Sequence, residues 1–82
     1  RIYPQVLINS KINPEKKSEL ETDTVIQKEI NQLKEEFKDN GRILIRPSGT
    51  EPLIRVMIEG ENQEYITKKA QKLANLIEER LK

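Results

Sequence analysis

The 82-residue sequence contains no cysteine and no histidine. A zinc site of the usual Cys/His kind is therefore excluded, and nothing suggests a disulfide-stabilised scaffold. Histidine is also the most common general base, so the sequence offers no serine–histidine pair for nucleophilic catalysis. These absences favour a domain that binds or positions a ligand over one that carries out acid–base chemistry.

Aromatic residues and excess charge are scarce as well. The sequence has two tyrosines and one phenylalanine, and its 15 basic and 14 acidic residues leave a net charge of +1. Binders of single-stranded RNA usually stack bases on aromatic side chains within a basic surface, so no nucleic-acid partner is expected. No apolar run approaches the roughly 20 residues of a membrane-spanning helix, so no membrane partner is expected. We expect a cytoplasmic protein.

The length of the sequence predicts one domain over residues 1–82. Apolar residues make up 34% of the chain, and they fall in periodic runs, which argues against disorder. The sequence starts at Arg1 and an apolar pattern begins at the next residue. We therefore interpret the chain as a segment of a longer protein.

Hydrophobic periodicity predicts five elements separated by polar stretches. Alternating apolar residues indicate three strands, whereas apolar residues spaced three or four apart indicate two amphipathic helices. A polar segment after the first strand is expected to be a solvated loop or an irregular helix start. The strands cover residues 6–12, 42–46 and 53–59, the helices 23–39 and 62–82, and the polar segment 14–22.

Capping residues mark the ends of the predicted helices. Asp23 or Thr24 suits the start of the first helix, and Thr24 also begins a capping-box spacing. Asn40 or Gly41 suits a left-handed cap at its end. Asn62 suits the start of the second helix.

The element order predicts an α+β fold of the type β-α-β-β-α, with a small antiparallel or mixed sheet and both helices on one face. The short connection 47–52 predicts an antiparallel hairpin. The other sheet face carries Leu7, Leu44, Leu53 and Met57, and we expect a neighbouring domain to cover it. The predicted core consists of Val6, Ile8, Ile26, Ile30, Leu33, Phe37, Ile43, Ile45, Ile54, Val56, Ile58, Ile66, Ala70, Leu73 and Ile77.

The hairpin connection has a composition that an ordinary turn does not require. It reads Arg-Pro-Ser-Gly-Thr-Glu-Pro from 46 to 52, and a further arginine follows at 55. The guanidinium groups of Arg46 and Arg55 match phosphate oxygens, and the hydroxyls of Ser48 and Thr50 are donors. Gly49 permits a close backbone approach or a positive φ, and successive amides at 48–50 can converge on one anion.

Glu51 is the exception among these donors. Its carboxylate suits three partners, namely an arginine that it orients, a sugar hydroxyl or an amine. The loop contains no nucleophile–base pair and no cluster of carboxylates for a metal, so it is interpreted as a binding loop. Two readings stay open on these residues alone, because proline, serine and glycine also form ordinary rigid turns.

The stretch 46–52, followed by Arg55, resembles the phosphate-binding loop in the C-terminal domain of the α-D-phosphohexomutase superfamily. Residues 3–7 resemble the opening of the same domain, and the resemblance extends over essentially the whole chain. Gly49 and Glu51 favour the branch that acts on glucosamine phosphates. The alternatives are the phosphomannomutase/phosphoglucomutase branch and a noncatalytic α+β interaction module.

The resemblance implies a TBP-like fold and a defined role for the loop. Arg46, Ser48, Gly49, Thr50 and Arg55 match positions that grip the substrate phosphate that is not being transferred. Glu51 matches the motif as a candidate contact to the sugar or to another binding residue.

The resemblance also implies a longer enzyme that interconverts glucosamine 6-phosphate and glucosamine 1-phosphate for cell-wall precursor synthesis. Its phosphoserine and Mg²⁺ site belong to the other domains, which are this segment's partners together with the phosphosugar. The segment alone then holds no catalytic or metal-binding residue and is expected to be inactive.

Overall fold

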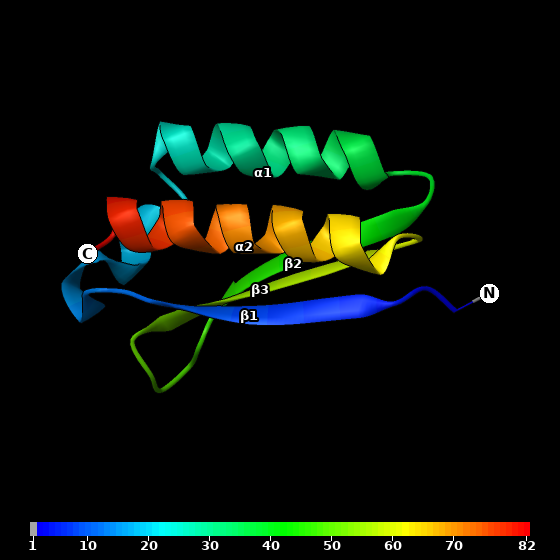
Figure 1. Ribbon diagram of the computed structural model, residues 1–82. Coiled ribbons are helices and arrows are strands. Elements are labelled where there is room, and N and C mark those ends of the chain that lie inside the picture. The colour runs from blue at the N-terminus through cyan, green and yellow to red at the C-terminus, as the bar shows by residue number, and fades with distance from the viewer. Residues whose placement is uncertain (1) are drawn as a thin grey trace.

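A computed structural model describes residues 2–82 (Figure 1). The five predicted elements are present, and a 3₁₀ helix, η1, occupies most of the segment that was expected to be a loop or an irregular helix start. The predicted α+β order is therefore confirmed with one addition. The elements are β1 (Gln5–Lys11), η1 (Pro14–Leu20), α1 (Thr24–Phe37), β2 (Gly41–Pro47), β3 (Leu53–Gly60) and α2 (Gln63–Arg80).

The three strands form one antiparallel sheet in the order β1-β3-β2, so β3 is the central strand. The predicted hairpin of β2 and β3 is confirmed, with Ile45 opposite Val56. On the other side of β3, Ile8 lies opposite Val56 as well. This register places alternate residues of all three strands on a common face, where Ile54, Val56 and Ile58 have no exposed surface.

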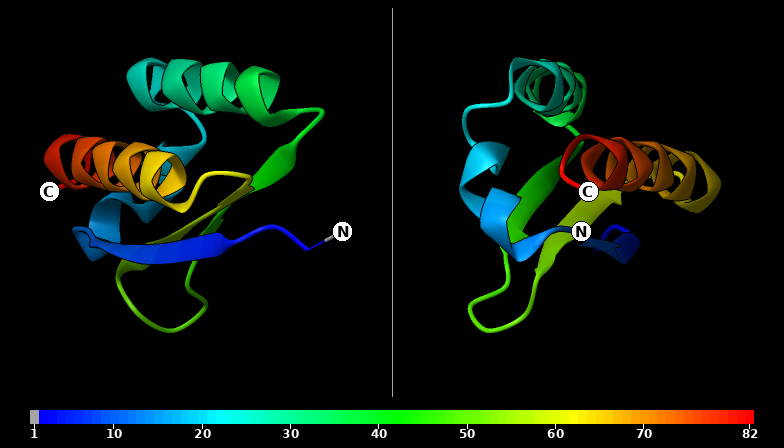
Figure 2. Two further views of the ribbon diagram at one scale, coloured as in Figure 1. Left: turned by 45° about the vertical axis from the view of Figure 1, so that its right-hand side comes forward. Right: turned by 90° about the vertical axis from the view of Figure 1, so that its left-hand side faces the viewer.

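Both helices cover the same face of the sheet (Figure 1, Figure 2). α2 packs on β1 and β3, and α1 packs on β2 and against α2. The core between these layers also includes Leu20 of η1 and Leu81 after α2. Its buried members are Ile12, Leu20, Ile26, Ile30, Leu33, Phe37, Ile54, Val56, Ile58, Ile66, Ala70, Leu73, Ala74, Ile77 and Leu81, and Val6, Ile8, Ile43 and Ile45 are partly buried against them.

One polar side chain lies within this layer. Ser10 of β1 points to the helices and is fully buried. Its hydroxyl donates a 2.8 Å hydrogen bond to the carbonyl oxygen of Ala74 in α2. The bond satisfies the buried hydroxyl and links β1 to α2.

The helix caps differ in part from the predicted ones. Asp23 is the N-cap of α1 and accepts a 3.0 Å hydrogen bond from the amide of Ile26. Thr24 is the first residue of the helix, so the capping box predicted from it is wrong. Asn62 caps α2 as predicted and accepts a 2.8 Å bond from the amide of Tyr65.

The predicted left-handed C-cap of α1 is also wrong. Lys38, the C-cap residue that follows α1, has a right-handed conformation, and Asn40 has a negative φ. Gly41 has φ 157° and already pairs with Gly60 as the first residue of β2. The chain turns directly into the strand, which removes the need for a left-handed cap.

The N-cap carboxylate of Asp23 predicts an acid-dependent loss of stability. The amide of Ile26 lowers its pKa below the usual 3.8, burial opposes this shift, and the guanidinium of Arg80 at 3.0 Å adds to it. A lowered pKa stabilises the fold above pH 3.8, and the effect is lost as the pH falls through the folded-state value.

Replacement of this carboxylate tests that expectation by chemical denaturation. We expect Asp23→Ala to cost about 1 kcal/mol at neutral pH, whereas Asp23→Asn keeps a capping oxygen. The stability difference between the parent and Asp23→Asn should be constant at neutral pH and vanish in strong acid. A difference that persists unchanged at pH 2 would contradict this assignment.

Candidate functional site

The loop between β2 and β3 is held by its own hydrogen bonds. The amide of Ser48 donates to the carbonyl of Leu53 at 2.9 Å, and the amide of Leu53 donates to the carbonyl of Glu51 at 2.8 Å. The amide of Glu51 donates to the hydroxyl oxygen of Ser48 at 3.2 Å. Ser48 is only 6% exposed, so its first role is to shape the loop, although its hydroxyl proton remains available for a ligand.

The segment that follows β1 forms hydrogen bonds to one limb of this loop, the part formed by Glu51 and Pro52. The amide of Ile12 donates to the carbonyl of Pro52 at 3.0 Å, and the ammonium of Lys17 donates to the carbonyl of Glu51 at 3.3 Å. Sequence reasoning missed Lys17, since its contact depends on η1 and the polar sequence of η1 shows no helical periodicity. The loop is therefore fixed on the side of Glu51 and Pro52.

The other limb presents unused donors. Gly49 and Thr50 are exposed, and their amides donate to no acceptor within residues 2–82. A Cβ atom at Gly49 would meet nothing within 4 Å, and this glycine does not adopt the positive φ allowed for in the sequence analysis. Because the Ser48 amide is already used, two of the three amides expected to face an anion remain free.

The two arginines of the motif lie directly opposite each other. Arg46 of β2 pairs with Arg55 of β3, and Asn9 of β1 lies on the other side of Arg55. Their parity places all three on the sheet face away from the helices, and all are exposed. Like charges directly opposite in a sheet are destabilising, and neither arginine forms an ion pair within the described residues. The pair therefore suits an external anion.

The opposite end of the same sheet face provides a contrast. Arg42 lies opposite Glu59, with 3.6 Å between the guanidinium and carboxylate groups. Gln5 completes this row with a 2.8 Å hydrogen bond from its amide nitrogen to Glu59. Positive charge is thus compensated at one end of the face and uncompensated beside the loop. The two ends are separated by an apolar row of Leu7, Met57 and Leu44.

A groove of about 640 Å³ separates the loop from η1. Ser48 and Gly49 form one wall, and Lys17 and Glu21 lie on the other side. The groove gives a small ligand access to the loop. Its remaining lining residues are Pro14, Ser18, Leu20 and Pro47.

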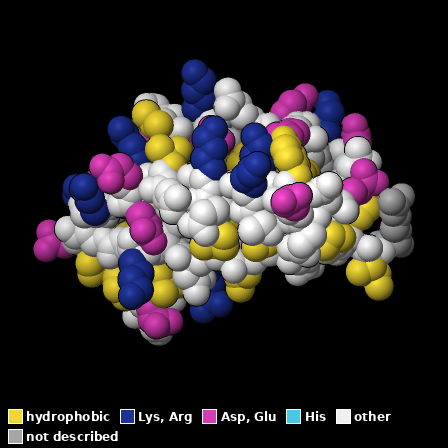
Figure 3. All heavy atoms as spheres, viewed as in Figure 1, with side chains coloured by type: hydrophobic (Ala, Val, Ile, Leu, Met, Phe, Trp, Pro, Cys, Tyr) yellow, Lys and Arg dark blue, Asp and Glu magenta, His cyan; other side chains and the backbone are white. Residues whose placement is uncertain are grey.

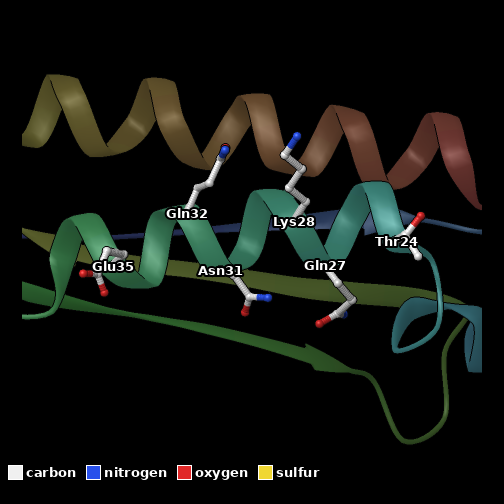
Figure 4. A pocket seen from close by; sticks show the side chains of 6 residues that line it. All are labelled: Thr24, Gln27, Lys28, Asn31, Gln32 and Glu35. Carbon is white, nitrogen blue, oxygen red and sulfur yellow. The ribbon is translucent and has the colours of Figure 1, made fainter.

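A second hollow follows the outer surface of α1, away from the loop (Figure 4). Its side chains all come from α1 and point in different directions, so they do not converge on one ligand. Figure 3 shows acidic and basic side chains interspersed over the visible face, which gives that face no uniformly basic surface. The residues that line the hollow are Thr24, Gln27, Lys28, Asn31, Gln32 and Glu35.

The described part of the chain contains no group of three or more carboxylate, histidine or cysteine side chains placed to hold a metal. Residues 2–82 also include no helix that is long and apolar enough to cross a membrane. The features that suit an anion are therefore the two free amides of the loop and the opposed pair Arg46 and Arg55 on the adjoining strand ends.

A known protein family matches the part of the chain that contains the candidate site. Residues 7–76 match the family described as phosphoglucomutase/phosphomannomutase, C-terminal domain. The chain belongs to this family. The matched residues contain the whole hairpin, its loop and both arginines, so the candidate site lies within the family domain.

Several proteins that are similar to this chain are named phosphoglucosamine mutase. The chain is 65% identical over 78 residues to the protein from Finegoldia magna, covering 95% of the chain and 17% of that relative. It is 56% identical over 80 residues to the one from Ruminiclostridium cellulolyticum, covering 98% and 18%. It is 51% identical over 81 residues to the protein from Acetivibrio thermocellus, and the alignment covers 99% of the chain and 18% of that relative. The chain thus spans less than one fifth of these relatives.

Proposed function

We propose that this chain is the C-terminal domain of a cytoplasmic phosphoglucosamine mutase and that its loop binds a phosphate group of the substrate. The observation that carries the proposal is the unpaired, directly opposed pair Arg46 and Arg55 beside a loop with two free amides. The names of the relatives support the substrate class. Four of the candidate residues contact the phosphate, namely Arg46, Arg55, Gly49 and Thr50. Ser48 shapes the loop and donates its hydroxyl proton.

The residues suit binding without reaction. Guanidinium groups form paired hydrogen bonds with phosphate oxygens, and free amides bind the same oxygens without carrying full charge. The loop offers no nucleophile–base pair, so it holds a phosphate and leaves it intact. The described residues do not fit Mg²⁺ either, and we place the metal ligands and the phosphoserine in other domains of the full-length protein.

The loop holds the phosphate that is not being transferred, which we call the idle phosphate. This contact helps the reaction at the other end of the sugar. In the proposed reaction, phosphoserine transfers its phosphoryl group to the free sugar hydroxyl, and the resulting bisphosphate returns the other phosphoryl group to serine. Phosphoryl transfer depends mainly on positioning and charge stabilisation. Binding energy from the idle phosphate orients the reacting end, so the loop must accept the phosphate of either glucosamine 6-phosphate or glucosamine 1-phosphate.

Titration of the chain with inorganic phosphate tests the location of this site. We expect the amide resonances of Gly49 and Thr50 and the side-chain resonances of Arg46 and Arg55 to shift together with one dissociation constant. Arg42 serves as the internal control, because Glu59 already compensates its charge. Shifts spread evenly over the surface, or none at Gly49 and Thr50 at tens of millimolar phosphate, would count against the proposal.

A further inference from the structure

Glu51 is the only acidic residue between Arg42 and Ile58. Its carboxylate is exposed and forms no ion pair or hydrogen bond within residues 2–82. The sequence left open that Glu51 orients an arginine, and the structure shows no such contact. A free carboxylate therefore stands in a loop whose other groups suit an anion.

The backbone of Glu51 is nevertheless held from three sides. Its amide donates to Ser48, and its carbonyl accepts both from the amide of Leu53 and from the ammonium of Lys17. These contacts come from the loop itself, from β3 and from η1. The loop thus fixes the origin of this side chain more firmly than it fixes Gly49 or Thr50.

A negative charge at this point opposes phosphate binding through space. Its effect is reversed for a ligand that carries a cation close to its phosphate, because the carboxylate then pairs with the cation. Two arginines and one carboxylate are complementary to a phosphate and one ammonium group. An amino-sugar phosphate has this charge pattern, and the corresponding neutral sugar phosphate does not.

We infer that Glu51 binds the ammonium group of an amino-sugar phosphate and so selects glucosamine phosphates over glucose phosphates. The inference rests on the proposed function, since it assumes that the loop holds the substrate phosphate. The amine on C2 adjoins a phosphate on C1 and is remote from a phosphate on C6. Glu51 therefore contacts the amine only when the loop holds the C1 phosphate.

The test uses the full-length protein that carries this domain. We compare kcat/KM for glucosamine 1-phosphate with kcat/KM for glucose 1-phosphate in the parent and in Glu51→Gln, because the loop holds the C1 phosphate of these two substrates. The ratio should fall about fivefold in the variant, as expected for loss of one exposed charge pair. Inhibition by inorganic phosphate should be unchanged or slightly stronger, since the variant removes a charge that repels phosphate.

Glu21→Gln is the matched control, because Glu21 lines the groove beside Ser48 and Gly49 from the end of η1. It removes the same charge nearby and should leave the ratio unchanged. Glu51 has no selective role if Glu51→Gln leaves the ratio unchanged or lowers both activities equally, or if Glu21→Gln lowers the ratio as much. A parent protein that acts on neither sugar phosphate would instead overturn the proposed function, and the inference with it.

Discussion

Arg46→Ala in the full-length protein is expected to lower kcat/KM for glucosamine 6-phosphate by about 100-fold, through a raised KM and a lowered kcat. The KM rises because a charged, paired hydrogen bond to the idle phosphate is lost. The kcat falls because the same contact positions the reacting end of the sugar. Steady-state kinetics in both directions measure the effect, and the loss must be equal in both because the overall equilibrium is fixed.

Arg42→Ala is the matched control for this variant. Arg42 lies on the same strand and the same sheet face as Arg46, but it pairs with Glu59. We expect its kinetics to stay within about twofold of the parent, because an exposed ion pair contributes little. Arg46→Ala should not lower the melting temperature, since it relieves the opposition to Arg55. Unchanged kinetics in Arg46→Ala would support the alternative of a rigid turn.

Much of this fold follows from local sequence signals. The alternation at Ile54, Val56 and Ile58 predicts a strand with one buried face, and these residues are fully buried. Asn62 before an apolar stripe predicts the start of α2, where it caps the helix. Such signals succeed because the period of the strand or helix and the capping chemistry are properties of neighbouring residues.

Features that depend on distant contacts were less predictable. η1 is polar apart from Leu20, and one apolar residue gives no period, yet packing buries that residue at 5% exposure. Ser10 is a poor core candidate by composition, but α2 supplies an acceptor for its hydroxyl. Both outcomes depend on elements that lie far away in the sequence.

The candidate site depends both on local sequence signals and on contacts between residues that are distant in the sequence. Ser48, Gly49 and Thr50 belong to one loop, so their donor chemistry can be predicted from the sequence. The sequence also predicts that Arg46 and Arg55 lie on strands of one hairpin, but only the register shows that they face each other. The hydrogen bond from Lys17 to the carbonyl of Glu51 depends on where η1 lies, so the sequence could not predict it.

Gly41→Ala is expected to destabilise the fold by about 3 kcal/mol, a large effect for a single substitution. A Cβ atom at this position would lie 2.0 Å from the carbonyl oxygen of Glu59, which belongs to the central strand and cannot move aside alone. The φ of 157° adds strain for any residue with a side chain. Thermal unfolding should show a midpoint lowered by about 15 °C for a domain of this size.

Gly49→Ala separates this structural role of a glycine from a binding role. Nothing lies within 4 Å of a Cβ atom there and φ is not positive, so stability should change by less than about 0.5 kcal/mol. Phosphate binding should nevertheless weaken, because the added methyl group lies beside the free amides of Gly49 and Thr50. Equal losses of stability in the two variants would contradict the packing at Gly41. Undiminished phosphate binding in a folded Gly49→Ala variant would place the anion elsewhere than on this limb of the loop.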